Sequence, residues 1–134
     1  MAKATKAKQI FLVTENEVGT LGKITDVLAS KGVNIQALAA YTGKEGKANF
    51  HIVTDNNEMA VKAIKERGYE DIKEQDVLVV EFENKAGTLA PIAKKLGDDG
   101  VDINAIYGTS ADGTKVIGVL STADDEKALR VING

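Results

Sequence analysis

One stretch of the sequence occurs twice, and this repeat restricts the chain to folds built from two similar units. Positions 15–21 (ENEVGTL) return 68 residues later as positions 83–89 (ENKAGTL). Over positions 15–38, 11 of 24 residues are identical in the second copy, where about one or two would match by chance. The chain of 134 residues is thereby divided into two units near the lower size limit for independent folding. We therefore predict two domains, 1–74 and 75–134, that pack against each other.

Charge and composition exclude several classes of function. The chain carries 17 Lys+Arg against 20 Asp+Glu, a net charge of −3, which disfavours nucleic acid or an anionic membrane as a partner. No apolar run approaches the length of a membrane span. There is no cysteine, which excludes disulfides and thiolate metal sites and favours a cytoplasmic location. The basic positions 1–8 predict a frayed start rather than a signal peptide.

Hydrophobic periodicity predicts the elements of the first copy. Positions 9–14 (QIFLVT) are typical of a central strand. Leu21, Ile24 and Leu28 recur at helical spacing, with Thr20 as the expected N-cap and Gly32 just past the end. A hairpin of strands 33–41 and 48–54 follows, joined by a polar turn at 42–47. A capping box at 55–58 opens a second helix that runs to 67, and 69–73 form a short fourth strand.

The second copy repeats this order but is shorter. We predict a strand at 76–82, a helix from Leu89 to about 97, a hairpin of strands 101–110 and 115–122 with a turn at 111–114, and a last helix at 124–132. Each copy thus has the β-α-β-β-α-β order of an α+β, ferredoxin-like fold, with both helices on one face of an antiparallel sheet. The second copy lacks a fourth strand, so either the N-terminal arm or a second chain is expected to cover its sheet edge.

The repeated loop sits between a strand and a helix, where its residue types favour anion binding. Gly19 allows a sharp turn and close approach to a ligand. The amides and the dipole at the start of the helix attract a carboxylate. The Asn side chain offers both a carbonyl and an NH2, and the two together can hold a zwitterion. A turn without any binding role explains the same residues and remains open.

The two stretches resemble the ACT domain, an amino-acid-binding regulatory module of biosynthetic enzymes. The resemblance covers nearly the whole chain, twice, and rests on Glu-Asn-x-x-Gly-x-Leu followed by Gly-Val-Asn-Ile. It is most similar to the serine-sensing ACT domain of phosphoglycerate dehydrogenase, where the ligand lies between the first loop of one domain and the second strand of another. The resemblance implies ligand-binding loop residues Asn16, Val18, Gly19 and Leu21, then Asn84, Ala86, Gly87 and Leu89, and the partner-strand residues Asn34 and Asp102.

The chain departs from that pattern at several positions. Val18 and Ala86 stand where many ACT loops carry proline. Thr14 and Phe82 stand where the serine sensor has a ligand-contacting histidine, so serine itself is not implied. Asp102 replaces the Asn at the equivalent position, and a carboxylate favours an ammonium whereas an amide serves either end of a zwitterion. We therefore expect the two sites to differ in affinity, and one of them can be empty.

Nothing in the sequence indicates catalysis, a cofactor or a metal. His51 is the only histidine and is interpreted as a residue of the third strand. No phosphate loop, dinucleotide fingerprint or catalytic triad is present. The sequence predicts a non-enzymatic, homodimeric regulatory protein that binds an amino acid. The alternatives are a regulatory subunit that acts by protein contact on an amino-acid biosynthetic enzyme or a transcriptional system, and a catalytic ferredoxin-like protein.

Overall fold

The fold of the chain divides into two units. A computed structural model describes residues 2–110 and 112–134. The N-terminal unit comprises Lys8–Gln75, and the C-terminal unit comprises Asp76–Gly134 together with the chain up to Ala7. Two long strands, β1 (Lys3–Glu15) and β4 (Ile72–Glu83), contribute to both units.

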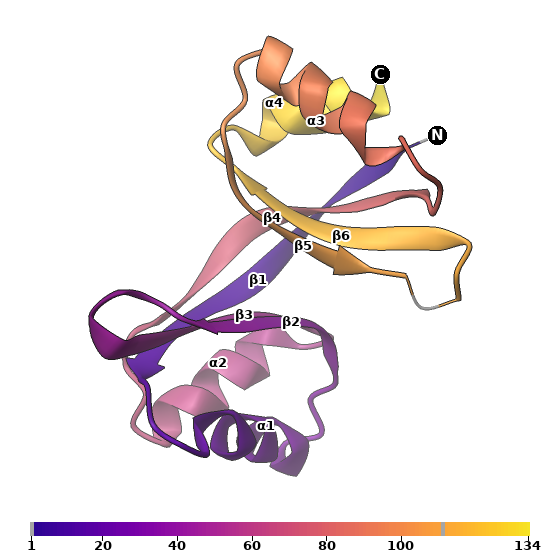
Figure 1. The fold of residues 1–134 in the computed structure, drawn as a ribbon. Helices are drawn as coiled ribbons and strands as arrows, with labels where there is room; N and C mark the ends of the chain where they lie inside the picture. The colour runs from indigo at the N-terminus through magenta and orange to yellow at the C-terminus, as the bar shows by residue number, and fades with distance from the viewer. Residues whose placement is uncertain (1, 111) are drawn as a thin grey trace. The chain divides into compact units, whose positions relative to one another are not determined.

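The N-terminal unit has the predicted ferredoxin-like order. Its strand order is β2-β3-β1-β4, and β3 pairs antiparallel with β1 and with β2. Figure 1 shows α1 and α2 on one face of this sheet. Ile10 and Leu12 of β1 face the helices and are fully buried with Ile24 of α1 and Ile64 of α2. The elements after β1 are α1 (Thr20–Ser30), β2 (Ile35–Thr42), the short 3-10 helix η1 (Lys44–Gly46), β3 (Lys47–Thr54), α2 (Asn57–Glu66) and the start of β4.

The C-terminal unit repeats this arrangement with its fourth strand taken from the other end of the chain. Its strand order is β1-β4-β6-β5. In both units the first strand of the ferredoxin-like repeat therefore lies between the third and the fourth, and the second strand lies at the edge beyond the third. Helices α3 and α4 cover one face (Figure 1), over a core that includes Leu78, Leu96 and Leu120. The elements after β4 are α3 (Leu89–Asp98), β5 (Ile103–Thr109), β6 (Lys115–Thr122) and α4 (Asp125–Asn133).

The first residues of the chain close the sheet edge that the second copy leaves open. Ala4 is 3% exposed within the core of the C-terminal unit. Its backbone N–H donates to Asn133 Oδ1 over 2.7 Å, and its carbonyl accepts from Asn133 Nδ2 over 2.9 Å. The N-terminal arm, one of the two expected covers, is therefore the fourth strand. The prediction of a frayed start over 1–8 is wrong for the described part of that segment, because backbone pairing and burial order it.

Several predicted element boundaries also need correction. Gly19, not Thr20, is the N-cap of α1, because the Thr20 hydroxyl donates to the Glu17 carbonyl instead. Asn56 caps α2 by accepting from Met59 N, whereas the Asp55 carboxylate accepts from Asn34 N. The two strands predicted at 69–73 and 76–82 are one continuous strand, β4. The predicted turn at 111–114 includes Ala111, which lies outside the described residues.

The helices of the two units are short, as the ferredoxin-like fold requires. Within residues 2–110 and 112–134, no helix has the length and apolar character needed to cross a membrane.

The paired hydrogen bonds between Asn133 and Ala4 predict a specific loss of stability. Asn133→Ala removes both bonds and leaves a buried backbone N–H unpaired. We expect a loss of about 2 kcal/mol in the free energy of unfolding, measured by urea denaturation. Arg130→Ala, on an exposed position of the same helix, is the matched control and should change stability by less than about 0.5 kcal/mol. Equal stability of the two variants would contradict the role assigned to this pair.

Candidate functional site

The loop between β1 and α1 is tied to the β2–β3 hairpin of its own unit. The backbone N–H of Asn16 donates to the Gly46 carbonyl over 3.1 Å. The side-chain NH2 of Asn16 donates to the Thr42 hydroxyl over 3.4 Å. The loop is thus held at two points before the helix begins. The sequence analysis assigns the side chain of Asn16 to ligand binding, but its NH2 group donates to the hairpin and holds the loop in place.

The equivalent loop between β4 and α3 is held in the same way. The backbone N–H of Asn84 donates to the Thr114 carbonyl and its side-chain NH2 donates to the Gly113 carbonyl, both over 3.0 Å. The Thr88 hydroxyl donates back to the Glu83 carbonyl over 2.7 Å. Two loops that share a sequence therefore share a backbone geometry. The Asn residues have a structural role in both copies.

In each loop, a glycine with a left-handed backbone conformation lies just before the helix. Gly19 has φ 90° and Gly87 has φ 84°, a backbone conformation that is costly for residues with a Cβ. No side chain among the described residues caps the first turn of α1 or α3, and neither first turn contains an acidic residue. An anion near either helix start would meet the positive end of the helix dipole without competition from a carboxylate in that turn.

A cavity of about 260 Å³ lies beside the first loop. It is formed by the loop, the first turn of α1 and the ends of β2 and β3. Among the expected site residues, Asn16, Gly19 and Leu21 line it, whereas the Val18 side chain is fully exposed. The lining residues that the sequence did not indicate include Tyr41, Thr42 and Phe50. The antiparallel pairing of β1 with β3, with Glu15 opposite Lys47, brings this end of the hairpin to the loop. Local periodicity in the sequence does not specify which strands pair.

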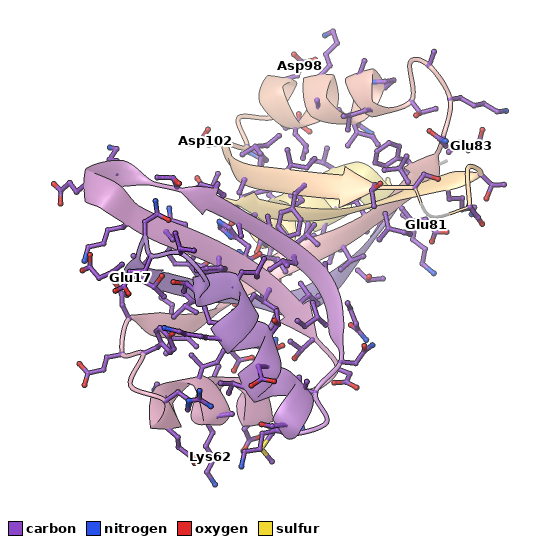
Figure 2. The ribbon with its side chains drawn as sticks, turned by 60° about the horizontal axis from the view of Figure 1, so that its bottom comes forward. Glu17, Lys62, Glu81, Glu83, Asp98 and Asp102 are labelled. Carbon is purple, nitrogen blue, oxygen red and sulfur yellow. The ribbon has the colours of Figure 1, made fainter. Side chains whose placement is uncertain are left out.

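The second-strand residues lie away from these loops within each unit. Asn34 directly precedes β2, and Asn16 contacts Thr42 at the other end of that strand. The eight residues of β2 separate them by about 26 Å at 3.3 Å per residue. In the C-terminal unit, Figure 2 shows Glu83, next to the loop, and Asp102 at opposite ends. A single unit therefore does not bring the predicted loop and strand residues together.

Ion pairs flank both loops. Lys47 pairs with Glu15 at the end of β1, and this hydrogen-bonded carboxylate raises the pKa of the lysine. Lys85 lies 3.1 Å from Glu83 at the end of β4, and its hydrogen bond and charge lower the pKa of that carboxyl. Because the side chains of these groups are exposed to solvent, the ion pairs contribute little to the free energy of unfolding.

A buried polar cluster in the N-terminal unit surrounds His51, which lies in β3 as expected. Its Nδ1 atom lies 3.1 Å from Gln9 Nε2, and its Nε2 atom lies 2.8 Å from the Tyr41 hydroxyl. Gln9 Nε2 also donates to Gln75 Oε1 over 3.0 Å. Burial lowers the pKa of His51 below its ordinary value of 6.5. The neutral ring is part of a structural network, and within the described residues no group of side chains is arranged to hold a metal.

Comparison with known proteins gives a family and a set of similar structures. A family model described as an ACT domain pair matches residues 5–133. A protein from Bacteroides thetaiotaomicron is 26% identical, with a TM-score of 0.87 over 97% of this chain and 88% of that one. The regulatory subunit of aspartate kinase from Thermus flavus is 17% identical, with a TM-score of 0.67 over 98% and 95% of the two chains. At that lower identity the likeness shows the fold alone. No match was found among curated proteins.

The positive φ of the two loop glycines predicts that replacing either one lowers the stability of the protein, even though an added Cβ would meet no neighbouring atom. No atom lies within 4 Å of a Cβ added at Gly19 or Gly87, yet Ala at either position must adopt a left-handed conformation. We expect Gly19→Ala and Gly87→Ala each to lower the free energy of unfolding by about 1 kcal/mol in urea titrations. Gly97→Ala, in α3 and equally uncrowded, should instead raise it by about 0.5 kcal/mol.

Burial of His51 predicts a pH dependence of stability. Because the folded protein holds the imidazole pKa below 6.5, the unfolded chain binds more protons as the pH falls below that value. Stability should therefore decrease as the pH falls from 6.5 toward the lowered pKa. His51→Gln cannot titrate, so the stability difference between wild type and variant should shrink over this range. A difference that does not change between pH 7 and pH 5 would contradict this assignment.

Proposed function

The chain belongs to the ACT domain pair family, and on this premise we propose that it is a regulatory protein that binds a free amino acid at the β1–α1 and β4–α3 loops. The observation that carries the proposal is the geometry shared by both loops. Each ends in a left-handed glycine at a helix start with no acidic first turn. In the first copy this loop borders a cavity of about 260 Å³, which is below the usual volume range for drug-sized ligands and suits a smaller molecule.

The two charged ends of an amino acid have separate partners in this proposal. The carboxylate lies at the helix start, where Gly19 or Gly87 leaves the backbone accessible. The ammonium is held by an acceptor outside the loop, and we assign this role to Asn34 and Asp102, the partner-strand residues that the resemblance implies. These residues lie at the far end of β2 and β5 from the loop in their own units, so the acceptor belongs to another copy of the domain.

A homodimer supplies that acceptor. In the N-terminal unit β2 is the outermost strand of its sheet. Antiparallel pairing of two such strands from two chains places the start of one beside the end of the other. Asn34 of one protomer then approaches Asn16 of its partner. The corresponding pairing of β5 brings Asp102 to Asn84, with a carboxylate in place of an amide, so the two sites differ in affinity.

In this proposal, amino-acid binding regulates the activity of another protein. Similar structures include a regulatory subunit of aspartate kinase, which favours an amino-acid biosynthetic enzyme as the partner and regulation in place of catalysis. The closer likeness to the serine-sensing domain of phosphoglycerate dehydrogenase stays a prediction. A second function, regulation by protein contact without an amino acid, is favoured by the tethering of Asn16 and Asn84 within their own hairpins.

Amino-acid binding is tested first by a thermal-shift screen against the twenty amino acids, followed by calorimetry on those that stabilise the protein. A ligand at 100 times its Kd stabilises the native state by about 2.7 kcal/mol. Asn16→Ala or Asn84→Ala should weaken binding about tenfold, because each loosens its loop from the hairpin and removes a polar group beside the ligand. A flat response to all twenty amino acids would contradict the proposal and favour regulation by protein contact.

Lys62→Ala is the control for both Asn variants. Lys62 is exposed on α2, and Figure 2 shows it away from Glu17, which marks the first loop. Its substitution should leave binding unchanged. Equal affinity of the Lys62 variant and both Asn variants would remove the loops from the site.

A further inference from the structure

The interiors of the two copies differ at one position directly behind the repeated loop. Phe50 of β3 pairs with Leu12 and is 3% exposed in the core of the N-terminal unit. The equivalent residue of β6 is Gly118, which pairs with Val80. A benzyl side chain is thus replaced by a hydrogen atom on the face of the sheet that α3 covers. The C-terminal unit must fill this space in another way or leave it open.

The structure leaves part of it open. A cavity of about 20 Å³ lies between α3 and the sheet, and apolar residues and Gly118 form its entire lining. That volume exceeds the minimum for one water molecule, but a site with no polar partners does not hold an ordered water. It has room for about one methyl group. The main lining side chains are Phe82, Leu89, Ile92, Leu96, Ile106 and Leu120.

The mouth of this cavity adjoins the repeated loop. Leu89, the first residue of α3, follows the loop directly and is 43% exposed, and Ile106 of β5 is 49% exposed. In the N-terminal unit the residues equivalent to Leu89 and Gly118 are Leu21 and Phe50, and both line the cavity beside the first loop. The apolar cavity of the C-terminal unit is therefore an inward extension of the same site, opened by the absence of the aromatic ring.

We propose that the C-terminal unit is selective for an amino acid with a branched aliphatic side chain, of the valine, leucine and isoleucine class. This inference rests on the proposed amino-acid binding at the β4–α3 loop. One methyl group of the ligand enters the cavity beside Gly118, and the rest of its side chain packs between Leu89 and Ile106 at the mouth. The carboxylate of the ligand remains at the β4–α3 loop, and its ammonium remains at Asp102 of the partner subunit. Phe50 closes the equivalent space in the N-terminal unit, which is not selective in this way.

Burial of apolar ligand surface in a dry site provides the preference. A methyl group placed in the cavity leaves water and contacts side chains that otherwise face an empty volume. A ligand that ends in a hydroxyl would leave that group without a hydrogen-bond partner there. The site therefore favours valine over both alanine, which is too short, and serine, which is polar.

Gly118 offers a substitution that fills the cavity without disturbing the fold. A Cβ added at Gly118 would lie 3.7 Å from the Tyr107 carbonyl oxygen and 3.9 Å from that of Val80, both ordinary contact distances. The φ of Gly118 is not in the left-handed region, so alanine fits the strand. Its methyl group would occupy the space proposed for the ligand. The ligand-free Gly118→Ala protein should melt at or above the wild-type temperature.

The experiment is calorimetric titration of the full chain with valine, isoleucine, alanine and serine. Wild type should bind valine or isoleucine at least tenfold more tightly than alanine, the discrimination expected for one or two methyl groups in an apolar pocket. Gly118→Ala should reduce that preference to less than threefold. Ala93→Val, which adds methyl groups to the cavity from the helix side, should have the same effect. Gly97→Ala, on α3 with no atom within 4 Å of its added Cβ, is the matched control and should keep the preference.

Each outcome decides between the two proposals. Binding of amino acids without an aliphatic preference would overturn this inference and leave the proposed function standing. An aliphatic preference that survives both Gly118→Ala and Ala93→Val would remove the cavity from the site. Failure of every amino acid to bind would overturn the inference together with the proposed function.

Discussion

The completion of the second sheet by the first residues of the chain is the constraint on which the rest of the structure depends. Strand edges carry unpaired N–H and C=O groups, which must be paired, covered or exposed to water. In the C-terminal unit, β1 lies beside β4, and Asn133 holds Ala4 through both its N–H and its carbonyl. Residues that are 129 positions apart therefore belong to one unit, and that unit does not form from a contiguous segment.

The sharing of β1 and β4 has a consequence for folding. Each of these strands begins in one unit and ends in the other, and the chain must close a loop of nearly its whole length to bring Ala4 to Asn133. Long loop closure costs conformational entropy, which the burial of Ala4 and the pairing of the strand offset. The N-terminal unit, in contrast, is built from the single segment Lys8–Gln75.

The two copies share the backbone of their repeated loop and differ in side chains elsewhere. The loops keep the residues that determine their backbone, namely an Asn that contacts the hairpin and a left-handed Gly. Other positions have changed. Phe50, beside the first loop, corresponds to Gly118, and Asn34, at the far end of β2 from that loop, corresponds to Asp102. Backbone geometry is thus retained where both copies need the same turn, and side-chain chemistry differs where a ligand or partner would be contacted.

Much of the fold and part of the candidate site followed from the sequence because the signals are local. The repeat, the helical spacing of Leu21, Ile24 and Leu28, and Gly32 just past the end of α1 together indicated two ferredoxin-like units, and the structure confirms this. The residue types of the loops also led directly to Gly19 and Gly87, whose positive φ the structure shows. Expectations based on capping were weaker, since neighbouring groups compete for the same hydrogen bonds. Thr20 bonds Glu17 and Asp55 bonds Asn34.

The sequence by itself determined the repeated unit, its order of elements and the loop that connects strand to helix, because each depends on residues close together in the chain. Only the tertiary structure decided that the arm before Lys8 completes the C-terminal sheet and that Asn34 and Asp102 lie far from the loops of their own units. It alone decided that Gly118 leaves an apolar cavity where Phe50 fills the first copy. These features depend on which strands lie side by side, because that order brings distant residues together, and local hydrophobic periodicity does not specify it.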